Sequence, residues 1–292
     1  MSTAVLDRAF PEVGRNAAHG SSVKVLHVIN GEHYAGAERV QDLLAMRLSE
    51  LGFEVGFACL KRGEFAKVRR AKQARLHEVV MRSRFDLRPV AALIRLVRSE
   101  GYDLIHAHTP RSAIIAGIVS KLTGVPMVCH VHSPVLRDTT HRVRNWINGL
   151  VEQLSTRQAS ALVAVSESLG GYVGRRKAAR GKVTVVPNGV PAATSQEISS
   201  EQAAVWTLGT VALFRPRKGL EVLLRSLAKL RALGFPVRLR AVGKFETDEY
   251  EAEIKALAHA LKIEQFIDWV GFTDRVDAEL ARMDLFVLPS LF

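Results

Sequence analysis

Short runs of apolar, β-branched residues alternate along the chain with longer segments whose apolar residues recur at helical spacing. Residues 23–29 (VKVLHVI) have no helical period and predict a buried strand. Residues 37–51 carry a Val/Leu stripe that predicts a helix, and Gly52 favours its end. Residues 54–60 are strand-like again, so one βαβ unit is predicted by residue 60.

The same alternation continues to residue 186 and restarts after a polar stretch. Further strands are predicted at 104–108, 127–131, 161–165 and 182–186, with helices at 87–99, 112–122 and 142–158. Beyond the proline-led segment 191–201, strands are predicted at 208–213, 237–242 and 267–270, with helices at 220–233, 250–261 and 277–283. Residues 284–290 (DLFVLPS) read as a buried strand that runs into a Pro-Ser turn.

Strands and helices at this spacing predict an α/β fold of two doubly wound parallel sheets. We expect residues 1–22 to form a loose polar tail and 23–190 a first Rossmann-like domain. Residues 191–205 are expected to be a linker, and 206–292 a partial second domain. Cys59 and Cys129 lie in strand-like runs and are expected to be reduced core thiols of a cytoplasmic protein.

The positive charge of the chain belongs to its first domain. Residues 1–190 carry a net charge of +13 and residues 191–292 a net charge of −1, with basic clusters at 67–72 and 175–182. Such a surface favours an anionic partner: a membrane face, a lipid-linked phosphate or a nucleic acid. Solvated helix faces that keep the protein soluble are the alternative. Aromatic residues do not interleave with either cluster, which argues against nucleic acid.

A glycine-containing loop follows the first predicted strand, at the sheet edge where such folds bind ligands. It carries Gly31 and Gly36 and opens a helix, so its N–H groups can meet an anion. The G-x-G-x-x-G spacing of a dinucleotide site is absent, which disfavours an NAD-dependent oxidoreductase.

Four histidines lie near the ends of two other predicted strands. His106 and His108 alternate on one strand, and we expect them to face opposite sides of the sheet, one toward the cleft and one under a helix. His130 and His132 repeat the arrangement, and a structural role is the alternative for all four. We expect no metal pair here. His132 precedes Pro134 at the exit of its strand, which makes it the stronger functional candidate.

A cationic loop opens the second domain. Arg215, Arg217 and Lys218 stand between a predicted strand and a helix, although the N-terminal end of a helix dipole repels positive charge. A diphosphate held by these side chains and the helix N–H groups would explain them, and an ordinary basic turn is the alternative. Gly243 and Gly271 end two strands and allow a ligand to approach closely.

Eight motifs follow one another in a recognisable order. They are AGAER at 35–39, DLIHAH at 103–108, VHS at 131–133, VSES at 165–168, VPNGV at 186–190, RKG at 217–219, VG at 270–271 and DLFVLPS at 284–290. With these motifs, the chain resembles the retaining glycosyltransferases of the GT-B fold, in the family-4 group that includes many bacterial envelope-sugar transferases. In that fold two Rossmann-like domains face a cleft.

The resemblance implies a nucleotide-sugar donor held mainly by the second domain and a glycan or lipid-linked acceptor held mainly by the first. Lys218 would neutralise the leaving diphosphate without a metal or other cofactor, and His132 would contact the transferred sugar, whose anomeric configuration is retained. The other donor-side positions are Gly36, Arg215, Arg217, Gly243, Gly271 and Ser290, and the acceptor-side positions are His106, His108 and Asn188. The implied setting is envelope polysaccharide or lipopolysaccharide synthesis, in the cytoplasm or on the inner face of the membrane.

Two positions depart from the family pattern. Leu213 stands where the family commonly has an arginine partner for the lysine. The family continues past the last strand into E-x7-E, and the sequence ends before it. The sequence therefore predicts a fragment with little transfer activity by itself. A non-catalytic relative that binds an anionic glycan or a protein partner is the alternative.

Overall fold

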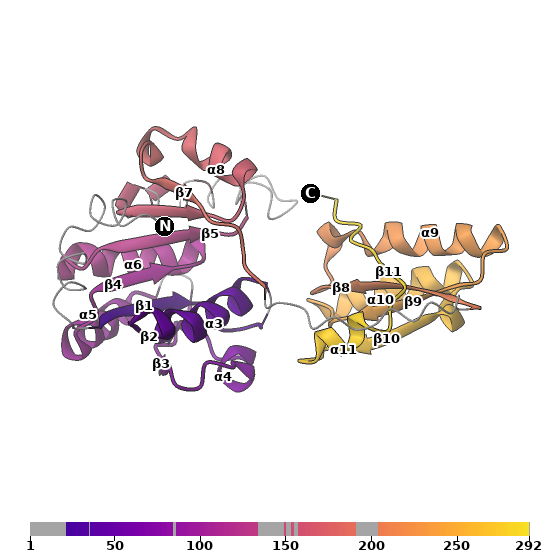
Figure 1. Ribbon diagram of the computed structural model, residues 1–292, viewed down its shortest axis with the longest axis horizontal. Helices are drawn as coiled ribbons and strands as arrows, with labels where there is room; N and C mark the ends of the chain where they lie inside the picture. Colours follow the sequence, from indigo (N-terminus) through magenta and orange to yellow (C-terminus); the bar gives the residue numbers. More distant parts are fainter. Residues whose placement is uncertain are drawn as a thin grey trace. The chain divides into compact units, whose positions relative to one another are not determined.

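In the computed structural model the chain divides into two compact units, Met1–Val190 and Pro191–Phe292 (Figure 1). The structure describes residues 22–34, 36–83, 86–133, 149, 153–154, 157–190 and 204–291. The predicted tail (1–22), the predicted linker (191–205) and the predicted helix 142–158 lie largely outside these residues.

The first unit is built on a parallel sheet that has, within the described residues, the strand order β3-β2-β1-β4-β5-β6-β7. Its strands are β1 (Val23–Ile29), β2 (Phe53–Cys59), β3 (Arg75–Glu78), β4 (Leu104–Ala107), β5 (Met127–Val131), β6 (Ala161–Ala164) and β7 (Val183–Val185). The strand order reverses between β1 and β4, the position at which open α/β sheets bind ligands beyond the carboxyl ends of their strands.

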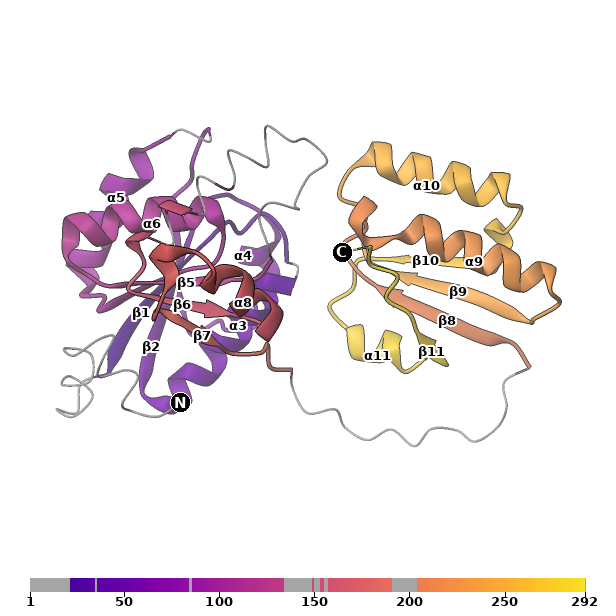
Figure 2. The same cartoon turned by 90° about the horizontal axis from the view of Figure 1, so that it is seen from above.

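Helices cover both faces of this sheet (Figure 2). They are α3 (Gly36–Leu48), α4 (Glu64–Val68), α5 (Arg88–Glu100), α6 (Pro110–Thr123) and α8 (Glu167–Gly174), with short 3₁₀ turns at Ser49–Leu51 and Lys177–Ala179. Leu26 and Val28 of β1 belong to the core beneath α5 and α6. Ile29 belongs to the opposite core, with Phe57 and Phe65. Burial on both faces explains why the strands read as continuous apolar runs.

The second unit repeats the architecture on a smaller parallel sheet, ordered β10-β9-β8-β11 in the described residues. Its strands are β8 (Trp206–Val211), β9 (Val237–Val242), β10 (Ile267–Gly271) and β11 (Leu285–Phe286). Its helices are α9 (Leu220–Ala232), α10 (Asp248–Ala260) and α11 (Val276–Leu280), with 3₁₀ turns η4 (Pro216–Lys218) and η5 (Glu264–Phe266). Here the strand order reverses between β8 and β11.

The last strand differs from its prediction. Residues 284–290 read as a buried strand, but only Leu285 and Phe286 pair with β8, and these side chains are 53% and 44% exposed. The reason is position in the sheet, because β11 is the edge strand of the described sheet and has one neighbour. The pattern analysis also missed α4, β3 and α8, which are short.

Two further observations concern the cysteines and the length of the helices. Cys59 and Cys129 are both buried in the core of the first unit. None of the helices in the described residues combines the length and the apolarity that crossing a membrane requires.

Candidate active site

The loops that follow β1 and β4 meet where the strand order of the first sheet reverses. Asn30 follows β1, and its side-chain oxygen accepts a hydrogen bond from the Thr109 hydroxyl at 3.3 Å. Thr109 also caps α6 in a reciprocal capping box with Ser112. The two loops are thus held together at the edge where a ligand is expected.

His106 and His108 do not face opposite sides of the sheet; that prediction was wrong. Their ring centroids lie 4.1 Å apart, and those of His130 and His132 lie 4.3 Å apart. The physical reason is the twofold repeat of a strand, in which residues two apart share a face. All four side chains therefore gather on one side of the sheet, and His27 of β1 joins them at 4.8 Å from His106.

These five side chains, His27, His106, His108, His130 and His132, form a histidine cluster. His27 Nδ1 and His108 Nε2 lie 2.9 Å apart, and His108 Nδ1 and His132 Nε2 lie 3.3 Å apart. The rings of His106 and His130 stack with centroids 5.4 Å apart. Sequence analysis missed His27, because its pairing with His106 depends on the register between β1 and β4.

The histidine cluster is held in its neutral form. Burial, followed by the charge of His130, lowers the pKa of His27 to about 3, and burial lowers the pKa of His132 to about 4. The pKa values of His106 and His108 are also lowered, first by burial and then by the neighbouring imidazoles. A buried imidazolium would lose its hydration and repel its neighbours. Each ring therefore offers one N–H and one nitrogen lone pair at neutral pH.

Other predicted positions of the first unit lie around this edge. Gly36 begins α3, and a Cβ added there would meet no atom within 4 Å. The start of α3 is anchored through buried Asp42, which accepts hydrogen bonds from the Tyr34 hydroxyl at 2.7 Å and from the backbone N–H of Ala71 at 2.9 Å. Asn188 lies beyond β7 and is exposed.

The cationic loop of the second unit lies between β8 and α9. Phe214 is buried and pairs with the strand end that follows β9, and the loop then turns through η4 to Gly219, whose φ of +67° is left-handed. Arg215 lies 3.4 Å from Glu246. Burial, then Arg217 and Arg215, lowers the pKa of Lys218. Among the described residues no carboxylate lies within ion-pair distance of Lys218.

The turn after β11 packs on this cationic loop. The backbone N–H of Leu291 donates a hydrogen bond to the carbonyl oxygen of Arg217 at 3.0 Å. A Cβ added at Gly219 would overlap the carbonyl oxygen of Pro289. Ser290 stands between these two contacts. The structure therefore brings Ser290, Arg217 and the first turn of α9 together where the strand order reverses, although they are separated by about 70 residues of chain.

The two strand-end glycines are not equivalent. The backbone N–H of Gly243 donates to the carbonyl oxygen of Gly271 at 2.8 Å. Gly243 has φ of +133°, and an added Cβ would overlap the carbonyl oxygen of Ala212. Gly271 has φ of +76°, and nothing lies within 4 Å of its added Cβ. The absence of a side chain at Gly243 thus makes room for the backbone of Ala212. Of the two glycines, only Gly271 leaves the open space that a ligand needs.

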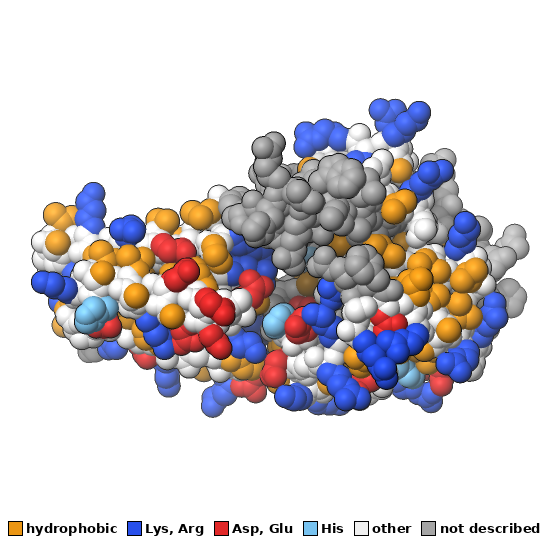
Figure 3. Space-filling view, turned by 180° about the vertical axis from the view of Figure 1, so that it is seen from behind, with side chains coloured by type: hydrophobic (Ala, Val, Ile, Leu, Met, Phe, Trp, Pro, Cys, Tyr) orange, Lys and Arg blue, Asp and Glu red, His pale blue; other side chains and the backbone are white. Residues whose placement is uncertain are grey.

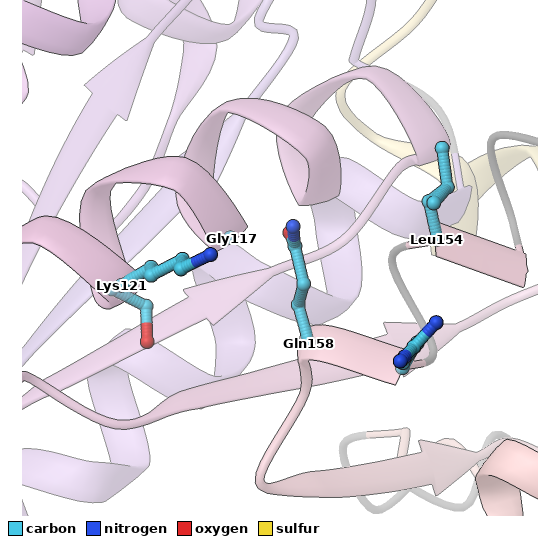
Figure 4. A pocket seen from close by; sticks show the side chains of 6 residues that line it. Gly117, Lys121, Leu154 and Gln158 are labelled. Carbon is cyan, nitrogen blue, oxygen red and sulfur yellow. The ribbon is translucent and has the colours of Figure 1, made fainter.

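A cavity of about 500 Å³ lies elsewhere in the first unit (Figure 4). Gly117, Ser120 and Lys121 of α6 line one side, and Gln158 extends toward Gly117 from the other. None of the predicted site residues lines it. Because α6 begins at the carboxyl end of β4, its later turns lie away from the candidate ligand edge.

Two parallel α/β units, each with polar loops where its strand order reverses, have the architecture of the GT-B fold, the fold of the glycosyltransferase structures that the chain resembles. The chain belongs to Glycosyltransferase Family 4, whose family model matches residues 34–194, and the model described as Glycosyl transferases group 1 matches residues 194–292. A crystal structure of Anabaena Alr3699/HepE in complex with UDP and glucose superposes with a TM-score of 0.77 at 20% identity. That match covers 92% of this chain and 74% of the other.

Two curated relatives match shorter parts of the chain. An Escherichia coli UDP-Gal:alpha-D-GlcNAc-diphosphoundecaprenol alpha-1,3-galactosyltransferase is 26% identical over 107 residues, 36% of this chain and 28% of that protein. The uncharacterized glycosyltransferase YqgM of Bacillus subtilis is 27% identical over 211 residues, 68% of this chain and 55% of YqgM. The chain thus matches 28% of the length of the E. coli relative and 55% of the length of YqgM.

Proposed function

We propose that this chain carries the donor and acceptor elements of a glycosyltransferase that moves a sugar, with retention, from a nucleotide sugar to a glycan or lipid-linked acceptor. Envelope polysaccharide or lipopolysaccharide synthesis is the proposed setting. Lys218 carries the proposal, because it is a partly buried cation whose pKa is lowered by burial and by two neighbouring arginines. A diphosphate at this loop would supply the missing negative charge.

In the proposed reaction, the bond between the anomeric carbon and the diphosphate oxygen breaks, and its electron pair leaves with the diphosphate. An acceptor hydroxyl forms the new bond to the same face of the sugar and passes its proton to the departing diphosphate. Lys218, with Arg215 and Arg217 nearby, stabilises the departing charge together with the N–H groups of the first turn of α9. This arrangement supplies positive charge from side chains, so we propose that no metal is needed at the diphosphate.

In the first unit, His132 is proposed to contact the transferred sugar. Its neutral ring, with the pKa lowered to about 4, can donate or accept a hydrogen bond to a sugar hydroxyl. Gly36 is proposed to let the N-terminus of α3 approach the diphosphate, since space around its Cβ position is open. His106, His108 and Asn188 are proposed for the acceptor side.

An anionic, lipid-linked acceptor fits the charge of the first unit. Lys and Arg side chains are spread over the face that Figure 3 shows. Residues 1–190 hold a net charge of +13. The E. coli relative acts, by its name, on a diphosphoundecaprenol-linked sugar. Attraction of such a surface to anionic lipid is worth about 1 kcal/mol per basic residue near the membrane. We therefore propose a peripheral contact with the inner membrane face.

Calorimetric titration of the full 292-residue chain with UDP, GDP, ADP and the matching monophosphates tests the donor site. UDP is titrated first, because the HepE structure contains UDP. One diphosphate is expected to bind at least 10-fold more tightly than its monophosphate, because the second phosphate adds charge-assisted contacts worth about 1.5–3 kcal/mol. Equal affinity for both, or binding of neither, would contradict the proposal. Binding of envelope glycans without any nucleotide would instead support the non-catalytic alternative.

A further inference from the structure

The histidine cluster contains more buried nitrogen than its own hydrogen bonds can satisfy. His108 and His130 are 3% and 5% exposed. Within the described part of the chain, both ring nitrogens of His130 lack a hydrogen-bond partner, as do Nε2 of His27 and Nε2 of His106. Leaving a buried polar atom unpaired destabilises a fold, so four such nitrogens in one cluster call for a physical explanation.

We propose that His108, His130 and His132 bind one divalent transition-metal ion of the zinc type. One ring nitrogen from each lies within 4.8 Å of those of the other two. His108 Nδ1 and His132 Nε2 are already 3.3 Å apart. Two nitrogens bound to one tetrahedral zinc, at 2.0–2.1 Å each, lie about 3.3–3.4 Å apart. A small rotation of His130 would complete the three-nitrogen set.

His27 supplies the outer support that a metal-binding histidine requires. It lies behind His108, with its Nδ1 2.9 Å from His108 Nε2. If Nδ1 of His108 binds the metal, its Nε2 carries the proton. This Nε2–H then donates a hydrogen bond to Nδ1 of His27. This hydrogen bond selects the tautomer of His108 and fixes its ring. His27 is therefore a positioning residue for the metal site and not a ligand.

The donor set narrows the kind of metal. Imidazole nitrogens suit zinc, copper, nickel and iron, whereas magnesium and calcium prefer oxygen ligands. In the described residues the two candidate ligand groups around His108 consist of histidines alone. His132 is the least buried of the three ligands.

A second group, formed by His27, His106 and His108, is the competing arrangement. It is the less favourable one, because His27 Nδ1 and His108 Nε2 are separated by 2.9 Å, an ordinary hydrogen-bond distance. That distance is shorter than the separation of two ligands on a tetrahedral ion. The proposed site goes beyond the proposed function, because it adds an ion at His108, His130 and His132. A His132 that binds through Nε2 still has an Nδ1–H to donate to a sugar hydroxyl.

The test uses the metal-free full chain without nucleotide. After chelator treatment, Zn²⁺ is titrated in competition with a chromophoric chelator, and Co²⁺ is added separately as a spectroscopic probe. We expect one tight equivalent of Zn²⁺ and the intense visible absorption of four-coordinate Co²⁺. No Zn²⁺ binding at about 10 µM free metal, or a weak octahedral Co²⁺ spectrum, would overturn the proposal.

Variants locate the ion. His130→Gln and His132→Gln each remove a ligand and are expected to weaken Zn²⁺ binding by more than about 100-fold, whereas His27→Gln should weaken it by about 10–100-fold. His259→Gln removes an exposed histidine paired with Glu264 and should leave affinity unchanged. His132 is only partly buried, so its variant stays informative if His130→Gln fails to fold.

Undiminished affinity in His130→Gln and His132→Gln would place the ion elsewhere and refute the site. The result is separable from the donor proposal, because nucleotide plays no part in the measurement. UDP binding in excess EDTA provides the reverse check. It is expected to persist whether or not the histidines bind zinc, since the proposed diphosphate contacts are Lys218 and the start of α9.

Discussion

Lys218→Ala is expected to weaken nucleoside-diphosphate binding by about 10–100-fold, the equivalent of one charge-assisted hydrogen bond of about 1.5–3 kcal/mol. The pKa of Lys218 is lowered by burial, Arg217 and Arg215, so its charge is held at some cost while no anion is bound. The negative charge of a bound diphosphate would offset that cost. Removing the ammonium should therefore reduce affinity without lowering the stability of the second unit, which urea denaturation can verify.

Lys229→Ala is the matched control. Lys229 is exposed near the C-terminal end of the same helix, α9, so its removal changes net charge equally but lies far from the proposed phosphate. Calorimetry should give wild-type affinity for this variant. If Lys218→Ala and Lys229→Ala bind UDP equally well, the cationic loop is an ordinary basic turn. In a longer chain with transfer activity, loss of a group that stabilises the leaving charge is expected to lower kcat by about 10²–10³.

Gly243→Ala is expected to destabilise the second unit by about 3 kcal/mol or more. Two costs combine, because the backbone has φ of +133° and the new Cβ would overlap the carbonyl oxygen of Ala212. Backbone strain of this kind costs about 1–3 kcal/mol, and overpacking costs a similar amount. Ala212 is itself tied to the sheet through a hydrogen bond to Val242 at 3.0 Å, so it cannot move aside without breaking that contact.

Gly271→Ala separates strain from overlap. Gly271 has φ of +76° and no atom within 4 Å of an added Cβ, so only the backbone cost of about 1 kcal/mol remains. Urea unfolding followed by tryptophan fluorescence reports on this unit, since Trp206 and Trp269 lie in β8 and β10. Similar unfolding midpoints for Gly243→Ala and Gly271→Ala would show that the Ala212 contact relaxes easily.

The alternation of apolar runs and helical stripes was sufficient to predict two parallel α/β units. Val23–Ile29, Met127–Val131 and Val237–Val242 are strands with the predicted bounds. These strands can be recognised from the sequence because most of their positions are apolar and buried. β3 (Arg75–Glu78) was missed for the opposite reason, since it is a partly exposed, polar edge strand with one neighbour. The exposure of β11 was missed because a pattern cannot show which strand lies at an edge.

The histidines show a different limit. Spacing alone was enough to place His106 and His108 on one face, and the prediction misapplied the strand repeat. The wider grouping required more than spacing. His27 and His106 become neighbours only because β1 pairs with β4 in one particular register, across about 80 residues of chain. The sequence also holds no local sign that Asn30 and Thr109 meet at the same edge.

The sequence by itself determined the α/β class, the family resemblance and the cationic loop, because local periodicity and short motifs are written in neighbouring residues. Tertiary structure alone decided that Ser290 returns to Arg217, that Gly243 makes room for Ala212, and that five histidines share one buried face. These contacts depend on strand order and register, which are set by the packing of the whole sheet. The proposed diphosphate and metal sites therefore arise where distant strand ends are brought side by side.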